Sequence, residues 1–384
     1  MPDRVYLDWN ATTPLRPEAR QALAAAWDMT GNPSSVHAEG RQARRLVEDA
    51  RTAVAAAVSA RPQDVVFCSG GTEANAMALT PGLRRGSGWP IQRLVVSAIE
   101  HPSVLSGGRF PADATASINV SGAGVVDLDH LRALLADGPP PLVSVMSANN
   151  ETGAIQPVAE AAEIVHEAGG LLHVDAIQAL GKIPIDIKAM QADLVTLSAH
   201  KIGGPKGVGA LVLAEGVQGI EPLLRGGGQE LGRRAGTENV AGIVAFGAAA
   251  AAATAQLADN ADRLQILRER FEKGLKQAAD IIVFSEDAPR LPNTTLFTVP
   301  GLNAETAVIG FDLAGIAVSS GSACSSGKVQ PSHVLAAMGF GRDLAQGAVR
   351  ISLGWSTSET DIDLALKAWR KLADALLRGR RNTA

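Results

Sequence analysis

The sequence predicts an α/β fold in which helices cover a mostly parallel central β-sheet, joined to a smaller α+β domain. Short apolar runs rich in Val, Leu and Ile recur along the first two thirds of the chain, as strands buried on both faces do. Ala-rich segments of helical character, such as residues 157–168, separate several of these runs, an alternation typical of α/β proteins. Apolar residues make up 46% of the 384 residues, enough to fill a sizeable core.

Six apolar runs carry the strand prediction for the sheet. In chain order they are DVVFCS (64–69), RLVVSAI (93–99), LVSVMSA (142–148), GLLHVDA (170–176), DLVTLSA (193–199) and GVGALVL (207–213). After about Gly242 a long Ala-rich and charged helical stretch extends to about Ala279. Shorter strand-like pieces, IIVFSE, TTLFTV, GIAVSS and VRISLG, are then mixed with helices, which indicates the smaller α+β domain.

Charge and cysteine content narrow the class of protein. Lys and Arg total 35 and Asp and Glu total 39, for a net charge of −4, which argues against a nucleic-acid-binding or membrane-binding surface. The two cysteines do not make a disulfide framework, and a reducing compartment fits them better. The start MPDRVYLDWN has no leader pattern and no apolar run is long enough to span a bilayer, so we expect a soluble cytoplasmic protein.

A glycine turn follows the first predicted strand. SGGTEAN puts Gly71 and Thr72 where the strand gives way to an amphipathic helix. Glycine allows a ligand to approach the backbone, and a helix N-terminus suits a phosphate; the alternative is an ordinary turn between strand and helix. Cys68 lies inside the strand, where we expect it to act as a small buried hydrophobe.

Two further strand ends carry charged side chains. Asp175 ends a very apolar strand and Gln178 follows three residues later. A buried carboxylate needs a partner, which is either the start of the next helix or a protonated ring nitrogen such as that of a pyridine cofactor. Ser198 and His200 flank Lys201 after the next strand. Lysine forms Schiff bases when its environment frees the amine; a solvated loop lysine is the alternative.

The remaining candidate residues are weaker when each is taken alone. Lys206, in the same loop as Lys201, is a lower-ranked rival because it lacks adjacent Ser and His residues. His101 directly follows a predicted strand; it could stack on a flat ring and move protons, or it could simply cap a helix. Thr237, in the glycine-rich and basic segment GGGQELGRRAGTENV, suits a phosphate contact.

Two residues of the smaller domain also have side chains suited to chemistry. Cys324 lies in a Ser- and Gly-rich stretch with little apolar cover, which favours a reactive thiol on a mobile loop over an incidental surface cysteine. Arg350, in VRISLG, lies on a strand-like segment and could bind a substrate carboxylate through two parallel hydrogen bonds.

These motifs together resemble those of the cysteine desulfurases, which are pyridoxal-phosphate enzymes of fold type I, and in particular of the NifS/IscS-like class. The resemblance covers nearly the whole chain. Each motif is modestly specific, but ten in the family's order are very specific. They are YLDWNATTP, GNPSSVH, SGGTEAN, EHPSVL, NNETG, HVDAIQALGKIPID, SAHKIGGPKG, GGGQELGRRAGTENV, SSGSACSSGKVQPSHVLAAMG and VRISLG.

The resemblance implies a pyridoxal 5′-phosphate cofactor held as a Schiff base on Lys201, and no metal. Asp175 would pair with the ring nitrogen, Gln178 with the phenolic oxygen, and His101 would stack on the ring. Gly71, Thr72, Ser198 and His200 would hold the phosphate, and Thr237 would complete that cradle from the other subunit of a homodimer. Asn150 would lie near the phenolic oxygen and the substrate, whose carboxylate Arg350 would bind.

The implied reaction converts L-cysteine to L-alanine. Lys201 and His101 would transfer protons, and the Cys324 thiolate would attack the substrate sulfur and retain it as a persulfide. The stretch around Cys324 is similar to the longer loop of this class rather than to the RxGHxC-type segment of the SufS-like class. An acceptor protein, such as an iron–sulfur scaffold or a tRNA-thiolation relay, would then take the sulfur.

The resemblance also implies domain boundaries and leaves alternatives open. Residues 13–257 would form the large cofactor-binding domain, and residues 1–12 with 258–384 the small domain that carries the Cys324 loop. A selenocysteine lyase, another class V aminotransferase-like enzyme and a scaffold that has lost its activity are the other hypotheses. Trp9 occupies a variable position of its motif. The chain extends only about 30 residues beyond VRISLG, so the sulfur acceptor stays open.

Overall fold

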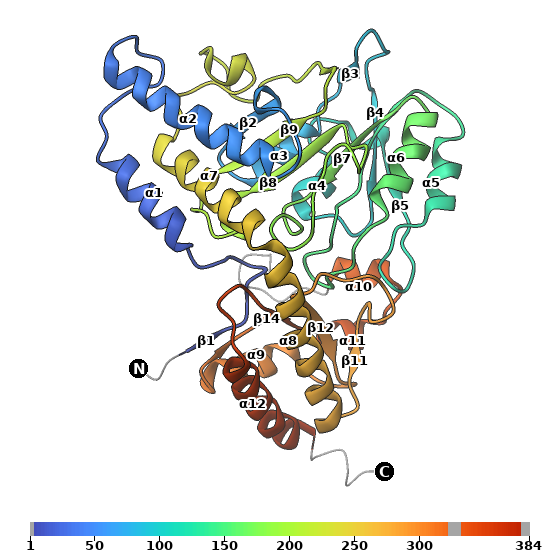
Figure 1. The fold of residues 1–384 in the computed structure, drawn as a ribbon. Coiled ribbons are helices and arrows are strands. Elements are labelled where there is room, and N and C mark those ends of the chain that lie inside the picture. The colour runs from blue at the N-terminus through green and yellow to red at the C-terminus, as the bar shows by residue number, and fades with distance from the viewer. Residues whose placement is uncertain (1–3, 322–331, 378–384) are drawn as a thin grey trace.

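The computed structural model describes residues 4–321 and 332–377, and its central element is a mostly parallel sheet (Figure 1). Within these residues the sheet has seven strands in the order β2-β9-β8-β7-β6-β4-β5. They are β2 (Val65–Cys68), β4 (Arg93–Ser97), β5 (Thr115–Ile118), β6 (Pro141–Ser144), β7 (Leu171–Asp175), β8 (Leu194–Ser198) and β9 (Gly209–Leu213). Strands β5, β4, β6, β7 and β8 pair in parallel, and β9 is antiparallel to both β8 and β2. The predicted α/β fold class is confirmed.

Both faces of this sheet are buried, which explains why its strands are continuously apolar. Alternate residues of β2 enter two different cores: Val65 and Phe67 lie in one, and Val66 and Cys68 in the other. Helices α2 (Ala38–Ala56), α5 (Leu128–Leu135), α6 (Val158–Glu167) and α7 (Val240–Ala255) contribute to the first core, and α3 (Gly71–Ala78) and α4 (Pro102–Leu105) to the second. The sequence missed β5, because two of its four residues are exposed and the continuous apolar signal is lost.

A second, antiparallel sheet lies below the first in Figure 1. Its strands, in the order β11-β12-β15-β14, are β11 (Ile282–Val283), β12 (Thr294–Thr298), β15 (Val349–Ser352) and β14 (Ser319–Ser320). Helices α8 (Leu257–Ala278), α9 (Ala304–Leu313) and α12 (Glu359–Leu377) pack on a core of its own. Trp369 organises that core, with the Phe297 ring edge-on at 5.1 Å and the Phe311 ring stacked at 6.3 Å.

The remaining elements are short. They are β1 (Val5–Tyr6), α1 (Pro17–Trp27), β3 (Arg84–Arg85), β10 (Val217–Gln218), β13 (Ile316–Ala317), α10 (His333–Ala337), α11 (Arg342–Gln346) and three single 3-10 turns, Pro62–Asp64, Ala112–Ala114 and Ala199–Lys201. Residues Gln229–Gly232 form an irregular turn in which Glu230 and Leu231 have positive φ. Side-chain oxygens of Asp127, Asn239 and Asn303 accept backbone N–H bonds at the starts of α5, α7 and α9, which accounts for where these helices begin.

The long helix expected after Gly242 is in fact two helices. Helices α7 and α8 meet at Gln256 with a bend of 69°. The amide oxygen of Gln256 accepts a hydrogen bond from Arg16 at 2.8 Å, which ties the bend to the segment before α1. In the part of the chain that the structure describes, no single helix is long and apolar enough to cross a membrane; the α7–α8 pair meets that criterion only when its two halves are taken together.

The N-terminal segment joins the two sheets. Strand β1 pairs in parallel with β13, and Val5 and Leu7 lie in the core of the second sheet. Further along, the Thr13 N–H and hydroxyl both donate to the His200 carbonyl beside the first sheet, at 3.0 and 2.8 Å. The division into residues 13–257 and residues 1–12 with 258–384 stays a prediction, but this segment does contact both sheets.

We predict that Gly354→Ala destabilises the protein by about 3 kcal/mol or more, because overpacking a rigid core forces neighbours to move. A Cβ at Gly354 would lie 1.9 Å from the buried Trp9 ring. Urea unfolding would measure the change. Gly122→Ala is the matched control, since Gly122 is exposed and the nearest atom would be 3.8 Å away. Equal unfolding midpoints for the two variants would contradict this account.

Candidate active site

The candidate site lies at the edge of the central sheet where the parallel strands end. A cavity of about 300 Å³ opens there, the position at which open α/β sheets bind ligands. Ten of the residues singled out in the sequence line it: Gly71, Thr72, His101, Asn150, Asp175, Gln178, Ser198, His200, Lys201 and Arg350. Asn10, Ala11, Ser103, Met146, Ala148 and Ile177 complete the lining, and the sequence had assigned no role to these six.

One end of the cavity has the features of an anion site. Helix α3 begins at Gly71, and Gly70 at its N-cap offers no side-chain acceptor, so the first N–H groups of the helix receive no side-chain cap. A Cβ at Gly71 would lie 2.3 Å from the Cδ1 atom of Ile177, so a larger residue here would displace that side chain. The Ser198 hydroxyl next to it is buried and has no hydrogen-bond partner in the described chain. Backbone donors and an unpaired hydroxyl fit a phosphate group.

Asp175, the last residue of β7, also lines the cavity. Its carboxylate is buried and accepts hydrogen bonds from the Ile177 N–H at 3.0 Å and from the Asn75 amide at 2.9 Å. Burial raises the pKa of Asp175, whereas these two donors and the nearby His101 and Lys201 side chains act to lower it. The bond from Ile177 is a local turn contact, since the described residues between β7 and β8 form no helix. The simpler interpretation, a bond to the start of a following helix, is therefore wrong, and the same residue also lines the cavity.

His101 both caps a helix and lines the cavity. Its Nδ1 accepts the Ser103 N–H at 3.1 Å at the start of α4 and lies 2.7 Å from the Ser103 hydroxyl. Burial lowers the pKa of His101, which favours a neutral ring. The capping alternative is therefore observed, together with a position in the cavity that a ring-stacking residue requires.

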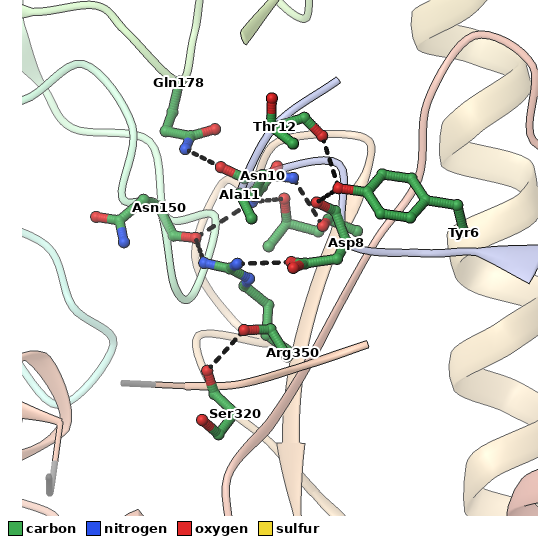
Figure 2. Close-up of polar contacts among 12 residues, drawn as sticks. Tyr6, Asp8, Asn10, Ala11, Thr12, Asn150, Gln178, Ser320 and Arg350 are labelled. Carbon is green, nitrogen blue, oxygen red and sulfur yellow. Dashed lines mark hydrogen bonds and ion pairs between the residues drawn. The ribbon is translucent and has the colours of Figure 1, made fainter. Parts of the chain in front are cut away.

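Lys201 follows β8 on a single 3-10 turn and extends toward the N-terminal segment. Its ammonium donates to the carbonyls of Asn10 and Ala11, the latter at 2.8 Å. The amide of Gln178 donates to the same Asn10 carbonyl at 2.9 Å (Figure 2). Lys206, the rival lysine, is exposed and absent from the residues that line the cavity.

A second lysine, which sequence reasoning missed, is buried behind Gln178. The Lys182 amine donates to the Gln178 amide oxygen at 2.6 Å and to the Asn10 side-chain oxygen at 3.1 Å. Burial lowers the pKa of Lys182 well below its usual value, and the positive charges of Lys201 and Arg350 add to that effect. Its motif HVDAIQALGKIPID was recognised, but its polar partner Asn10 lies 172 positions away.

Arg350 reaches the cavity from the second sheet. Its guanidinium donates to the Asn150 carbonyl at 3.0 Å and to the Asp8 carboxylate at 2.8 Å (Figure 2). The Nε of Arg350 is buried without a partner among the described residues. A planar cation that keeps one buried donor unused is suited to binding a carboxylate.

Glu151 is buried and lies beside Gly321 and Ser332. Its carboxyl accepts the Ser332 hydroxyl at 2.5 Å, and a Cβ on Gly321 would lie 3.6 Å from the same oxygen. Burial raises the pKa of Glu151 to about 7, although Ser332 and Arg350 act to lower it. Cys324 lies outside the described residues.

Two other residues singled out in the sequence, Thr237 and Cys68, lie outside the main cavity. Thr237 is not in the main cavity: it lines another one of about 210 Å³ together with Cys68 and Arg234. Within one chain the structure therefore does not bring Thr237 to the predicted phosphate site. Cys68 is buried in β2, so the expectation of a small buried core residue is confirmed, and burial raises the pKa of its thiol to about 12.

A family model and similar proteins of known function identify the same family for this chain. Residues 5–365 match the aminotransferase class-V family. The chain is 43% identical to a cysteine desulfurase of Cereibacter sphaeroides, over 97% of both chains. It is 39% identical to the cysteine desulfurase IscS of Dictyoglomus turgidum, over 98% of this chain and 96% of the relative.

Solved structures of similar proteins share the fold of this chain. A NifS-like protein from Rickettsia africae has a TM-score of 0.88 at 38% identity, over 97% of this chain and 99% of that one. SspA, solved in complex with cysteine, has a TM-score of 0.76 at 29% identity, over 91% of this chain and 98% of that one.

We predict that Glu151→Gln removes part of the pH dependence of stability. Below pH 4.5 the Glu151 carboxyl is protonated in both folded and unfolded chains. As the pH rises from 4.5 to about 7, the unfolded chain releases this proton while the folded chain keeps it. The unfolding free energy therefore falls over that window, by about 3 kcal/mol at most.

Urea unfolding of wild type and Glu151→Gln at pH 4.5, 5.5, 6.5 and 7.5 would measure this difference. Gln can still accept the Ser332 hydroxyl but does not titrate. The wild type should lose stability relative to the variant as the pH rises. Parallel curves over the whole range would mean that Glu151 does not retain its proton in the folded state.

Proposed function

The chain belongs to the aminotransferase class-V family, and from this premise we propose that it is a cysteine desulfurase that transfers sulfur from L-cysteine to Cys324. The observation that carries the proposal is one cavity in which Lys201, Asp175, His101 and Arg350 converge at the carboxyl ends of parallel strands. Relatives named as cysteine desulfurases at about 40% identity over nearly the full length support the same activity.

The residues present fit pyridoxal 5′-phosphate. Lys201 would hold it as a Schiff base, Asp175 would face the ring nitrogen, and His101 would stack on the ring. Gln178 and Asn150 would face the phenolic oxygen. The start of α3, with Gly71 and Thr72, and the hydroxyl of Ser198 would bind the phosphate with His200; the unpaired buried hydroxyl is the feature that favours this placement. When bound, this cofactor supplies an electron-accepting ring that weakens bonds near the amino group of the substrate.

Arg350 orients the substrate. Its guanidinium already contacts the Asp8 carboxylate and the Asn150 carbonyl, so the arginine is held in place before the substrate arrives. The carboxylate of L-cysteine would bind the unused Nε and compete with Asp8 for a second donor. Such a paired contact fixes the direction in which the substrate thiol points.

Lys201 and His101 move protons. Both lie in the cavity wall with Asp175, and a neutral imidazole can accept or return a proton near pH 7. The amine of Lys201, when it is not bonded to the cofactor, would serve as a base in the cavity.

Cys324 takes the sulfur. Its thiolate attacks the sulfur of the bound cysteine, a sulfur–sulfur bond forms, and the carbon–sulfur bond of the substrate breaks. The electron pair of that bond remains with the carbon, which gains a proton, so the products are alanine and a persulfide on Cys324. An acceptor protein, such as an iron–sulfur scaffold, then removes the sulfur.

The assembly of the enzyme belongs to the proposal as well. Thr237 would complete the phosphate site of a second copy of the chain. Its position outside the main cavity of its own chain is compatible with this. We therefore propose that the protein is a homodimer. We also propose that it works in the cytoplasm.

We predict that Cys324→Ala abolishes both persulfide formation and alanine release from L-cysteine, while the visible absorption band of the bound cofactor persists. The reason is that the thiol takes part only after the cofactor and substrate are in place. Alanine would be measured by chromatography and the persulfide by thiol-specific labelling.

Cys68→Ala is the control for this experiment, because Cys68 is a buried core thiol; it should retain most of the activity. Undiminished alanine production by Cys324→Ala would refute the role of Cys324. A colourless wild-type protein, purified with the cofactor supplied, would argue instead for a scaffold without activity. Side-by-side rates on cysteine and selenocysteine would test for a selenocysteine lyase.

A further inference from the structure

A line of polar side chains is buried on one face of the central sheet, behind the candidate site. Ser144, His173, Thr196 and Asn75 are all fully buried. Register pairs Ser144 of β6 with His173 of β7, and Asp175 of β7 with Thr196 of β8. Polar groups in such a place destabilise the fold unless they bind one another, so their hydrogen bonds should form a complete set.

The contacts form a continuous chain that ends at two residues of the site. His173 lies 2.8 Å from the Ser144 hydroxyl through Nδ1 and 3.1 Å from the Thr196 hydroxyl through Nε2. The Thr196 hydroxyl donates to the Asn75 side-chain oxygen at 2.6 Å. The Asn75 amide nitrogen then donates to both Asp175 and the Ser103 hydroxyl, each at 2.9 Å.

The residues of the candidate site determine which partner donates in each hydrogen bond of this series. The Asp175 carboxylate can only accept when ionised, so the NH₂ group of Asn75 must face it. The backbone N–H of Ser103 can only donate, so Nδ1 of His101 must accept it. The Ser103 hydroxyl, which receives Asn75 on one side, has its own proton available for the same Nδ1 at 2.7 Å.

The donor and acceptor roles of the hydrogen bonds within the sheet follow from this. Because Thr196 gives its proton to Asn75, it must accept one from Nε2 of His173, and Nδ1 of His173 must accept one from Ser144. A neutral imidazole meets both needs, and burial lowers the pKa of His173 to about 3. Every bond in the chain therefore points the same way, from Ser144 toward His101 and Asp175.

We propose that Asn75 is a positioning residue for the reaction. Asn75 is oriented by Thr196 and His173, and it links Asp175 to His101 through one series of hydrogen bonds that all point the same way. Asn75 holds the carboxylate that would face the cofactor ring. Through the Ser103 hydroxyl it also supplies a second donor to Nδ1 of His101, which the Ser103 N–H already makes an acceptor. The ring proton is therefore on Nε2, and the ring exchanges protons with the cavity through that atom. This inference rests on the proposed function, which gives His101 and Asp175 their importance.

Asn75→Asp tests the direction of the chain. An aspartate at this position accepts where Asn75 donates, so the Ser103 hydroxyl would turn toward residue 75 and leave a lone pair facing His101. It also puts a second carboxyl next to Asp175, and the two must then share a proton. Nitrogen-15 NMR of labelled histidines, in the full-length protein with the cofactor removed, would report the protonation and hydrogen bonding of both His101 ring nitrogens, assigned with His101→Asn.

The wild-type spectrum should show His101 with its proton on Nε2. Asn75→Asp should leave that proton in place, because the Ser103 N–H still donates to Nδ1, but it should shift the Nδ1 signal, because Nδ1 loses the Ser103 hydroxyl as its second donor. This readout involves neither cofactor nor turnover. An unchanged His101 signal in Asn75→Asp would overturn the proposal.

Thr196→Val and Thr196→Ser test the chain at a position that lines no part of the cavity. Val keeps the shape but removes the hydroxyl, which leaves the Asn75 oxygen without its donor. Affinity for pyridoxal 5′-phosphate, measured by titration on samples shown by urea unfolding to be folded, should fall about tenfold, the effect of losing one buried hydrogen bond. Ser keeps the hydroxyl and should restore the affinity. Equal affinities for Thr196→Val and wild type would overturn the proposal, and this pair decides alone if Asn75→Asp does not fold.

The proposal and the proposed function can fail separately. A wild type that makes no alanine from cysteine would refute the function but leave the His101 tautomer and its response to Asn75→Asp as measured. A fully active wild type whose variants all behave like it would refute the positioning chain alone.

Discussion

The shared direction of β4, β6, β7 and β8 is the constraint on which the rest of the site depends. Parallel strands end at the same edge of a sheet, so the residues that follow them come together although they are far apart in sequence. His101, Asn150, Asp175 and Lys201 reach one cavity for this reason. Strand β9 runs the other way, and its antiparallel pairing with β2 leaves the turn at Gly70 and Gly71 at the same edge.

A second constraint is electrostatic. The site contains three basic side chains, those of Lys182, Lys201 and Arg350. It also contains three carboxyl groups, those of Asp8, Asp175 and Glu151. Charges taken out of water require partners, and the N-terminal segment supplies several: the Asp8 carboxylate for Arg350 and the Asn10 oxygens for Lys201 and Lys182. Residues near the start of the chain thus hold the basic groups of a site that the two sheets build.

The sequence was informative where a residue's position on a strand determines its place. Lys201 and Asp175 could be placed at the cavity because each lies at the end of an apolar strand, and the fold class follows from the same strands. Lys182 and Asn75 lie inside recognised motifs, but their roles could not be found in this way, because their partners are contributed by distant segments. Strand β5 was missed because its exposed residues dilute the apolar signal, and the bend at Gln256 depends on a contact with Arg16. The roles of the site residues and the domain boundaries stay predictions.

The claim on which the whole account turns is that Lys201 holds the cofactor at this edge of the sheet. The most direct measurement is peptide mapping by mass spectrometry after the chain is loaded with pyridoxal 5′-phosphate and reduced with borohydride, which makes a Schiff base permanent. The account predicts a pyridoxyl-phosphate adduct on Lys201. An adduct on Lys206 or another lysine, with Lys201 unmodified, would contradict it.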